Sequence, residues 1–449
     1  MDKKKYLSLV LPVVLHQLVT TAVSFIDVLM ISELGAVNVA AVGICQNLYF
    51  IYYLFTTGMA GGMGIFISQY WGQKDIENIR RMLRMALVVV NSALIVLVLG
   101  GYFAAETVIH MTAGDAAPEV VQLGVDYFHL AMLSYLFSGV SLCFAYALRS
   151  IDKPGPVLLI ALLSLGLKVL LNYGLIFGNW GCPAMGIRGA AVALVITRMV
   201  EMVMTMLWVY KKEKILAIKF RHLFDFSWPM LKKLMKISLP VMINDVMYAV
   251  GMLFYVGAYS RIAVQALAAV EVANTIQNFF TTVVIGLGAA TAVVVGNMIG
   301  EGRADQVLLV GRRYLWIAIG AGVGVGALMV ATIPLTVVIF PIEAAVLAMV
   351  RKLLWVYGLC LPLRAISIMM TMGLLRGGGD TTFAFLVESS TIWLVGVPAV
   401  LISALVFKGP IHYVVAFTYL EQVAKGIACL IRFTRGKWIH NLVEQPLQP

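Results

Sequence analysis

The chain has 449 residues, of which 61% are apolar and only 12% are charged, and its mean hydropathy is +0.94. Soluble globular proteins carry about 25% charged residues, so this composition excludes an ordinary soluble protein and predicts one embedded in a membrane. The net charge of +11 does not indicate nucleic acid, because the basic residues fall between hydrophobic runs. The five cysteines form no CxxC pair, which predicts neither a metal site nor disulfides.

Twelve apolar windows follow one another along the chain, each long enough for the roughly 20 residues that a helix needs to cross a bilayer. A membrane barrel would show short alternating segments instead. The sequence therefore predicts an all-α fold, a polytopic membrane protein with twelve transmembrane helices. The predicted spans are 7–32, 37–68, 82–104, 125–148, 157–178, 186–210, 236–259, 266–298, 314–340, 351–375, 382–407 and 411–432.

The basic residues predict the orientation of these helices. Of the 33 Lys and Arg residues, 24 lie at the termini or in even-numbered loops, five lie near odd-numbered loops, and four lie inside predicted spans. Cytoplasmic loops are enriched in Lys and Arg. We therefore expect a multi-pass protein of the cytoplasmic (inner) membrane with both termini in the cytoplasm.

The two halves of the chain repeat each other. At an offset of 228 residues, Pro12 pairs with Pro240, Gly58 with Gly286 and Gly72 with Gly300, without a gap. After the fourth and tenth spans, Leu148-Arg149-Ser-Ile-Asp152 matches Leu375-Arg376-Gly-Gly-Gly-Asp380 with one residue of slippage.

Six spans in each half place both copies in the membrane in the same sense. This predicts two six-helix lobes related by a pseudo-two-fold axis along the membrane normal, with a cavity between them, an arrangement typical of transporters. The predicted organisation is an amino-terminal lobe at 1–210, a basic cytoplasmic linker at 211–235, a carboxyl-terminal lobe at 236–432 and a cytoplasmic tail at 433–449.

Ten charged residues lie inside predicted spans and away from the span ends, where a charge at the bilayer centre costs about 2.5–3.5 kcal/mol and often has a role. Their spacing separates two groups. Arg198 with Glu201, and Glu421 with Lys425, are three and four residues apart, so each pair is expected to neutralise itself on one helix face. The others are Asp27, Lys168, Asp245, Glu271, Arg364 and Glu388.

Asp27, Asp245 and Glu388 have no opposite charge three or four residues away on their own helix. Each therefore needs a partner from another helix, a bound cation or a proton. A carboxylate that alternates between a cation and a proton is what coupled transport requires. For Asp27 the alternative is a permanent salt bridge with Lys168. His16 is expected to be a packed polar side chain.

Other patterns narrow the chemistry. No GxxxxGK[ST] loop occurs, so we expect no ATP hydrolysis, and no nucleophile, cofactor or metal motif predicts an enzyme. Aromatic residues of the second and eighth spans are equally consistent with a cavity for flat organic molecules and with contacts to lipid. The cavity candidates are Tyr49, Tyr53, Phe279 and Phe280, and Pro12 and Pro240 are candidates for kinks or gating.

Several of these residues together resemble the multidrug and toxic compound extrusion (MATE) family, nearer its NorM-like branch. Leu11-Pro12, Asp27, Leu34-Gly35 and Ala40-Ala41-Val42 are similar to the family's first-helix signature. Leu375-Arg376-Gly-Gly-Gly-Asp380-Thr381 looks like its RGxGDT turn after helix ten. The likeness runs the full length of the chain.

The resemblance implies a secondary antiporter that exports cationic or amphipathic organic compounds in exchange for protons or sodium ions, by alternating access of two lobes. By position, Asp27 matches the acid held to bind the coupling cation, and Asn172 matches a fifth-helix residue of the NorM-like branch. Lys168 departs from the pattern, because its ammonium would compete with sodium for Asp27. Asp245, Glu271 and Glu388 are expected to shape a second cation or substrate site.

The expected partners are a small organic substrate and the lipid bilayer, with a monomer as the expected state. No cofactor is expected beyond the coupling ion, H⁺ or Na⁺, and no metal site beyond possible sodium. A flippase for lipid-linked oligosaccharides is the alternative function. Such flippases often have fourteen spans and cationic cavities, whereas this sequence predicts twelve spans and has several acids within them.

Overall fold

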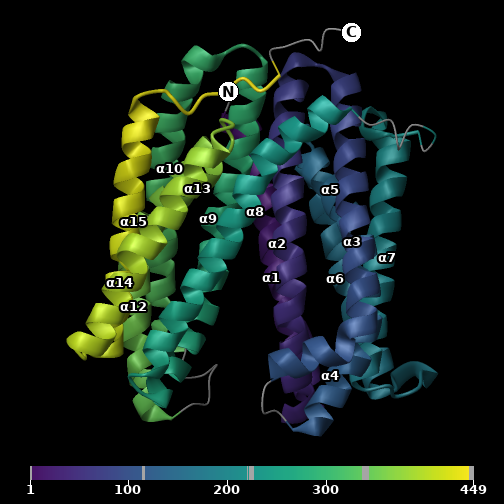
Figure 1. Cartoon of the computed structure of the whole chain (residues 1–449), viewed down its shortest axis with the longest axis vertical. Helices are drawn as coiled ribbons and strands as arrows, with labels where there is room; N and C mark the ends of the chain where they lie inside the picture. Colours follow the sequence, from purple (N-terminus) through teal and green to yellow (C-terminus); the bar gives the residue numbers. More distant parts are fainter. Residues whose placement is uncertain (1–2, 114–116, 220, 222–226, 336–342, 444–449) are drawn as a thin grey trace. The chain divides into compact units, whose positions relative to one another are not determined.

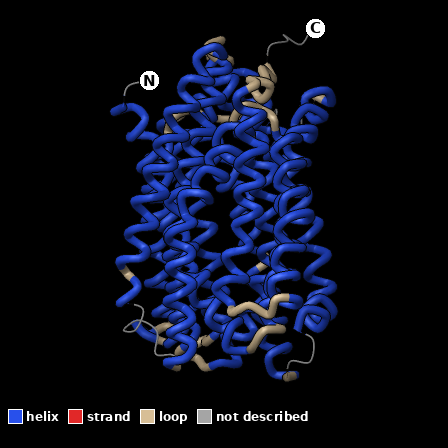
Figure 2. Tube along the Cα trace, turned by 90° about the vertical axis from the view of Figure 1, so that its left-hand side faces the viewer, coloured by secondary structure: helices blue, strands red, loops and turns tan. Residues whose placement is uncertain are grey.

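The structure, a computed structural model, describes residues 3–113, 117–219, 221, 227–335 and 343–443. Residues 220 and 222–226 of the predicted linker and 444–449 of the predicted tail lie outside the described residues. In the part of the chain that is described, long helices are joined by short loops and no strand occurs (Figure 2).

The helices run side by side along the long axis within each part of the chain (Figure 1). The α-helices are α1 Lys3–Ser32, α2 Ala36–Gln73, α3 Ile76–Ala113, α4 Pro118–Ala131, α5 Leu133–Ser150, α6 Pro154–Phe177, α7 Ile187–Lys212, α8 Trp228–Ser260, α9 Val264–Gly300, α10 Ala304–Ala331, α12 Ala344–Ile368, α13 Thr381–Thr391, α14 Val397–Leu401 and α15 Ile411–Thr434. Short 3₁₀ turns are η1 Asn179–Gly181, η2 Lys214–Leu216 and η4 Ile333–Leu335, and π-helical segments are η5 Met369–Leu375, η6 Ile392–Gly396 and η7 Ile402–Val406.

Eleven of the described helical stretches are long and apolar enough to span a membrane, and a bent pair of helices makes twelve. The all-α, multi-pass fold predicted from the sequence is therefore confirmed. The start of α1 and the end of α15 lie at the same end of the molecule (Figure 1), as an even number of crossings requires.

One predicted span is wrong in its form. The sequence predicts a single helix over 125–148, but the structure has α4 and α5, which meet at a bend of 44° next to Met132. The first of the two begins earlier, at Pro118, where proline suits the first turn of a helix. Hydropathy could not mark the bend, because Ala131, Met132 and Leu133 contain no proline, glycine or charge.

The chain forms two compact units that are not contiguous in sequence. The first-half unit comprises Leu15–Ile67 and Asp75–Ser238, and the second-half unit comprises Met1–Val14, Ser68–Lys74 and Leu239–Pro449. The helices α1 and α2 thus contribute to both units.

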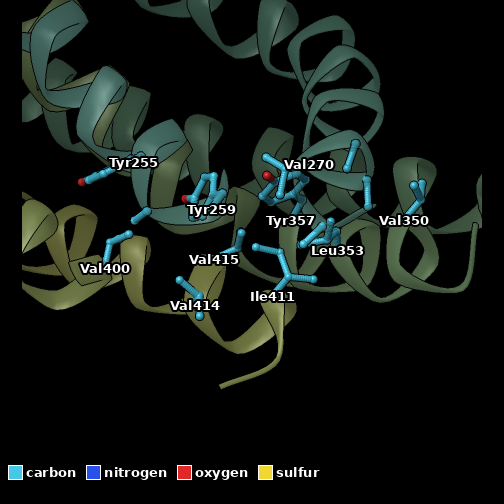
Figure 3. Close-up of a cluster of buried hydrophobic side chains, with 14 of the residues drawn as sticks. Tyr255, Tyr259, Val270, Val350, Leu353, Tyr357, Val400, Ile411, Val414 and Val415 are labelled. Atoms are coloured by element: carbon cyan, nitrogen blue, oxygen red, sulfur yellow. The ribbon is translucent and has the colours of Figure 1, made fainter. Parts of the chain in front are cut away.

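Each unit has its own apolar core, as helices that bury one face against neighbours require. In the second-half unit, tyrosines of α8 and α12 pack against aliphatic side chains of α9, α14 and α15 (Figure 3). A further cluster in that unit encloses Trp438 and Phe433, whose rings stack at 5.5 Å. In the first-half unit, Ile31 of α1 packs with Val42 of α2 and Ile187 of α7.

Two glycines that the repeat pairs allow a close helix crossing inside the second-half unit. A Cβ on Gly300 of α9 would overlap the carbonyl oxygen of Gln69 of α2 and lie 2.7 Å from its carbonyl carbon. A Cβ on Gly72 would lie 2.7 Å from the Glu301 nitrogen. Each repeat copy therefore supplies a glycine where the backbones of α2 and α9 meet, the role that small residues have in membrane helix packing.

Candidate functional site: buried charges in the two halves

Asp27 lies on α1 and its side chain contacts α6 in the first-half unit. Lys168 and Asn172 are one turn apart on α6, so their side chains leave that helix on the same face. The Lys168 Nζ forms an ion pair with Asp27 Oδ2, and the Asn172 Nδ2 donates a hydrogen bond to Asp27 Oδ1 at 3.0 Å. The Lys168 and Asp27 side chains are only 8% and 19% exposed. The buried acid thus has a cationic partner from another helix.

The two pairs expected to neutralise themselves do so. Arg198 Nη1 lies 2.7 Å from Glu201 Oε2 on α7, and Lys425 Nζ lies 2.9 Å from Glu421 Oε1 on α15. These contacts confirm the predictions made from their spacing. A charge in hydrocarbon surroundings is costly unless it is paired, which explains why each acid occurs together with its base.

Asp245 on α8 and Glu388 on α13 lie together in the second-half unit. Arg376, which follows the π-helical segment η5, joins them. Its Nη2 lies 2.8 Å from Glu388 Oε2 and 3.5 Å from Asp245 Oδ1. The Asn244 Nδ2 donates a further hydrogen bond to Glu388 Oε2 at 2.7 Å. Two of the three predicted second-half acids therefore share one guanidinium.

Lys425 extends this cluster to α15. Its Nζ, besides the contact with Glu421, lies 3.9 Å from Glu388 Oε1 and 5.8 Å from the centre of the Tyr248 ring. The Tyr255 hydroxyl donates a hydrogen bond to Glu421 Oε2 at 2.9 Å. The acids of this cluster, Asp245, Glu388 and Glu421, are thus held by cations and donors from several helices, whereas Asp27 has one cation.

The MatE family model matches residues 12–174 and 240–432. The chain belongs to the MatE family. The two matched stretches begin at Pro12 and Pro240, the residues that the offset of 228 pairs. The expectation of a transporter and not an enzyme is thereby confirmed.

Other MatE relatives cover most of the chain. It is 28% identical over 399 residues to the probable multidrug resistance protein NorM of Rhizobium meliloti, covering 86% of this chain and 83% of that protein. It is 25% identical over 417 residues to the multidrug resistance protein MdtK of Pectobacterium atrosepticum, with coverage of 89% and 87%. The crystal structure of the Vibrio cholerae MATE transporter VcmN in the bent form superposes with a TM-score of 0.87 at 16% identity, covering 96% of each chain. The resemblance seen in the sequence is confirmed.

Within this MatE chain, sequence reasoning missed Arg376. The sequence places it in a cytoplasmic loop, but its side chain is only 18% exposed. The available signal was the pair of acids, Asp245 and Glu388, that had no cation on their own helices. The π-helical segment before Arg376 widens the helix end, and such segments are frequent at functional sites.

Glu271 does not join the second-half cluster. It lies on α9 with an exposed side chain and forms no ion pair with any residue in the described ranges. Pro12 and Pro240 lie inside α1 and α8, which continue through them. Their part in gating stays a prediction.

The aromatic candidates are partly exposed. Tyr53 is 40% and Phe279 is 48% exposed. Tyr49 packs with its ring centre 6.2 Å from that of Tyr53, and Phe280 packs edge-on against Phe279 at 5.8 Å. Open ring surfaces of this kind suit substrate and lipid alike, so the substrate role stays a prediction.

Proposed function

We propose that this chain is a multidrug exporter that exchanges amphipathic or cationic organic compounds for protons, by alternating access. Membership of the MatE family and the names of its relatives, multidrug resistance proteins, support drug export over the flippase alternative. The observation that carries proton coupling is the ion pair between Lys168 and Asp27.

Lys168 favours protons over sodium at this carboxylate. Its ammonium supplies the single positive charge that a sodium ion would bring, and like charges at one site oppose each other. A proton does not have to share the site with the ammonium as a second free cation, because it adds to a carboxylate oxygen and removes the charge of Asp27. Sodium binding would require Lys168 to leave first.

Protonation would change how α1 is attached to α6. With Asp27 charged, Lys168 and Asn172 hold it from α6. With Asp27 neutral, the ion pair is lost and the ammonium needs another counter-charge. Glu201 on α7 would be that alternative, and it would then divide its charge between Lys168 and Arg198, its partner at 2.7 Å. The helix α1 would thus have two states, one with Asp27 bound to Lys168 of α6 and one with this ion pair broken. Alternating access requires an element with two such states.

The second-half unit would contribute to substrate binding. Asp245 remains 24% exposed although Arg376 is near, so it is suited to attract an organic cation. Glu388 would act with it through the shared Arg376, and Glu271, which lies apart on α9, would be a separate acid of this unit. Partly exposed aromatic rings would hold flat substrates; the candidates are Tyr49 and Tyr53 of the first-half unit and Phe279 and Phe280 of the second-half unit. We further propose an inner-membrane monomer with both termini in the cytoplasm.

Purified protein in proteoliposomes tests this function. A proton gradient alone should drive uptake of a cationic dye, and a sodium gradient alone should not. Asp27→Asn should abolish the proton-driven uptake. Asp126→Asn is the matched control. Asp126 forms an ion pair with Arg188 at 2.7 Å, but the Arg188 side chain is 60% exposed, so this pair is not buried like that of Asp27. Undiminished transport by the Asp27 variant, or sodium-driven transport by the wild type, would contradict the proposal.

A further inference from the structure

Arg149 and Arg376 occupy the same position in the two copies of the repeat, directly after Leu148 and Leu375. Arg376 has carboxylate partners on α8 and α13. Arg149 has none: its contacts within the described residues are with a histidine and a tyrosine. One half thus contains a guanidinium whose counter-charge is missing.

The repeat explains the difference. The offset that pairs Pro12 with Pro240 also pairs Gln17 with Asp245 and His16 with Asn244. The first half therefore has an uncharged amide where the second half has an acid. It also has no acid in the place of Glu388, because residues 160 and 161 are Ile and Ala.

The contacts of Arg149 leave its charge unmatched. Its Nη2 lies 2.8 Å from His16 Nδ1. Because arginine can only donate, that nitrogen accepts and the imidazole is neutral. The Tyr146 ring lies 5.6 Å from the guanidinium carbon. The Arg149 Nε is buried and has no hydrogen-bond partner among the described residues. A guanidinium in this state favours a planar anion that accepts two hydrogen bonds.

The surroundings of Arg149 indicate what would carry that anion. Tyr53 lies near the guanidinium and is 40% exposed, and Tyr49 lies beside Tyr53. Aromatic faces next to a guanidinium suit a flat ring system that bears an acid group.

We infer that Arg149 binds a carboxylate of the exported compound, so that the first-half unit takes flat aromatic amphiphiles that carry an acid as well as a cation. This inference rests on the proposed function and names its substrate class. Arg149 is then a specificity-determining residue that the expectation of cationic substrates does not include.

The test compares a rhodamine dye that has a free carboxylate with its methyl ester, in proteoliposomes of neutral lipid. Arg149→Gln should raise KM for the free acid at least about tenfold, because a charged hydrogen bond contributes about 1.5–3 kcal/mol. KM for the ester should change little. For Arg149→Lys, KM for the free acid should lie between the values of the wild type and Arg149→Gln, since lysine keeps the charge and loses the planar fork of donors. Arg81→Gln, which removes an exposed arginine paired with Glu77 at 2.5 Å, should alter neither.

Any of these transport results would overturn the inference: an equal loss of transport of both dyes in Arg149→Gln, an unchanged KM for the free acid in that variant, or wild-type export of the ester alone. Wild type that exports neither dye overturns the proposed function instead. Should Arg149→Gln not fold, fluorescence anisotropy of the free acid bound to solubilised wild type and Arg149→Lys gives the same comparison. A free-acid preference that disappears when anionic lipid is added would assign the site to a lipid headgroup and contradict a substrate carboxylate.

Discussion

The ammonium of Lys168 forms an ion pair with the carboxylate of Asp27, and both side chains are largely buried within one compact unit. Removing one partner of a buried ion pair leaves an uncompensated charge, which costs about 3–5 kcal/mol. Substitution of Lys168 should therefore test the role of this ion pair as directly as substitution of Asp27.

Lys168→Asn should change the coupling ion. Without the ammonium, Asn172 is the one donor to the Asp27 carboxylate that remains among the described residues, and the carboxylate is open to an external cation. We expect a sodium gradient to begin to drive dye transport in proteoliposomes, and proton-driven transport to weaken. The control is Asp27→Asn combined with Lys168→Asn, which should respond to neither gradient. Unchanged ion dependence in Lys168→Asn would show that the pair does not select the ion.

Glu388→Gln should destabilise the second-half unit. Glu388 accepts from Arg376 and Asn244, and its loss leaves the buried guanidinium with Asp245 alone. We expect the free energy of unfolding to fall by about 3 kcal/mol or more, measured as a lower Tm in detergent. Glu271→Gln is the matched control, because Glu271 is exposed, and its Tm should stay near that of the wild type. Equal Tm shifts for the two variants would contradict this account.

Hydropathy and residue spacing predicted the features that depend on a single helix, namely the membrane spans and the ion pairs within one helix. The spans follow from apolar length, and the Arg198–Glu201 pair follows from the helical repeat. Both depend on residues that are neighbours in sequence, so one chain suffices to find them.

Contacts between helices were harder to predict: the sequence offered the pair of Asp27 with Lys168 only as an alternative, and it did not indicate the contacts of Arg376. That Arg376 turns inward to Glu388 depends on the π-helical segment before it and on how α8 and α13 pack. The bend at Met132 likewise has no residue that marks it. The position of Glu271 depends on which face of α9 is covered, which a helix apolar all round does not reveal.

Gly300→Ala should destabilise the crossing of α2 and α9. The added methyl would overlap the Gln69 carbonyl oxygen, and such overpacking costs about 1–3 kcal/mol. Gly320→Ala is the control, because a Cβ at Gly320 has no atom within 4 Å; in a helix it should stabilise by about 0.5–1 kcal/mol. Thermal unfolding in detergent should therefore shift in opposite directions for the two variants, and a Gly300→Ala protein at least as stable as wild type would exclude the close crossing.

Asp380 should make the stability of the second-half unit depend on pH. Burial alone would raise the pKa of this carboxyl, but contacts with His440 and Arg432 outweigh burial and hold the pKa below its usual value. The Arg432 Nε and Nη2 lie 2.9 Å and 2.8 Å from Asp380 Oδ2. A lowered folded-state pKa means that the unfolded chain takes up the proton first as pH falls.

The stabilisation from Asp380 is thus fully present above the unfolded pKa of about 3.9 and is lost as pH falls through the lower folded value. Asp380→Asn should have a lower Tm than wild type at pH 7, and the difference should disappear under strongly acidic conditions. Arg432→Gln should be non-additive with it, because both variants break the same contact. A Tm difference that is independent of pH, or additive effects of the two variants, would show that the Asp380 charge does not contribute through Arg432.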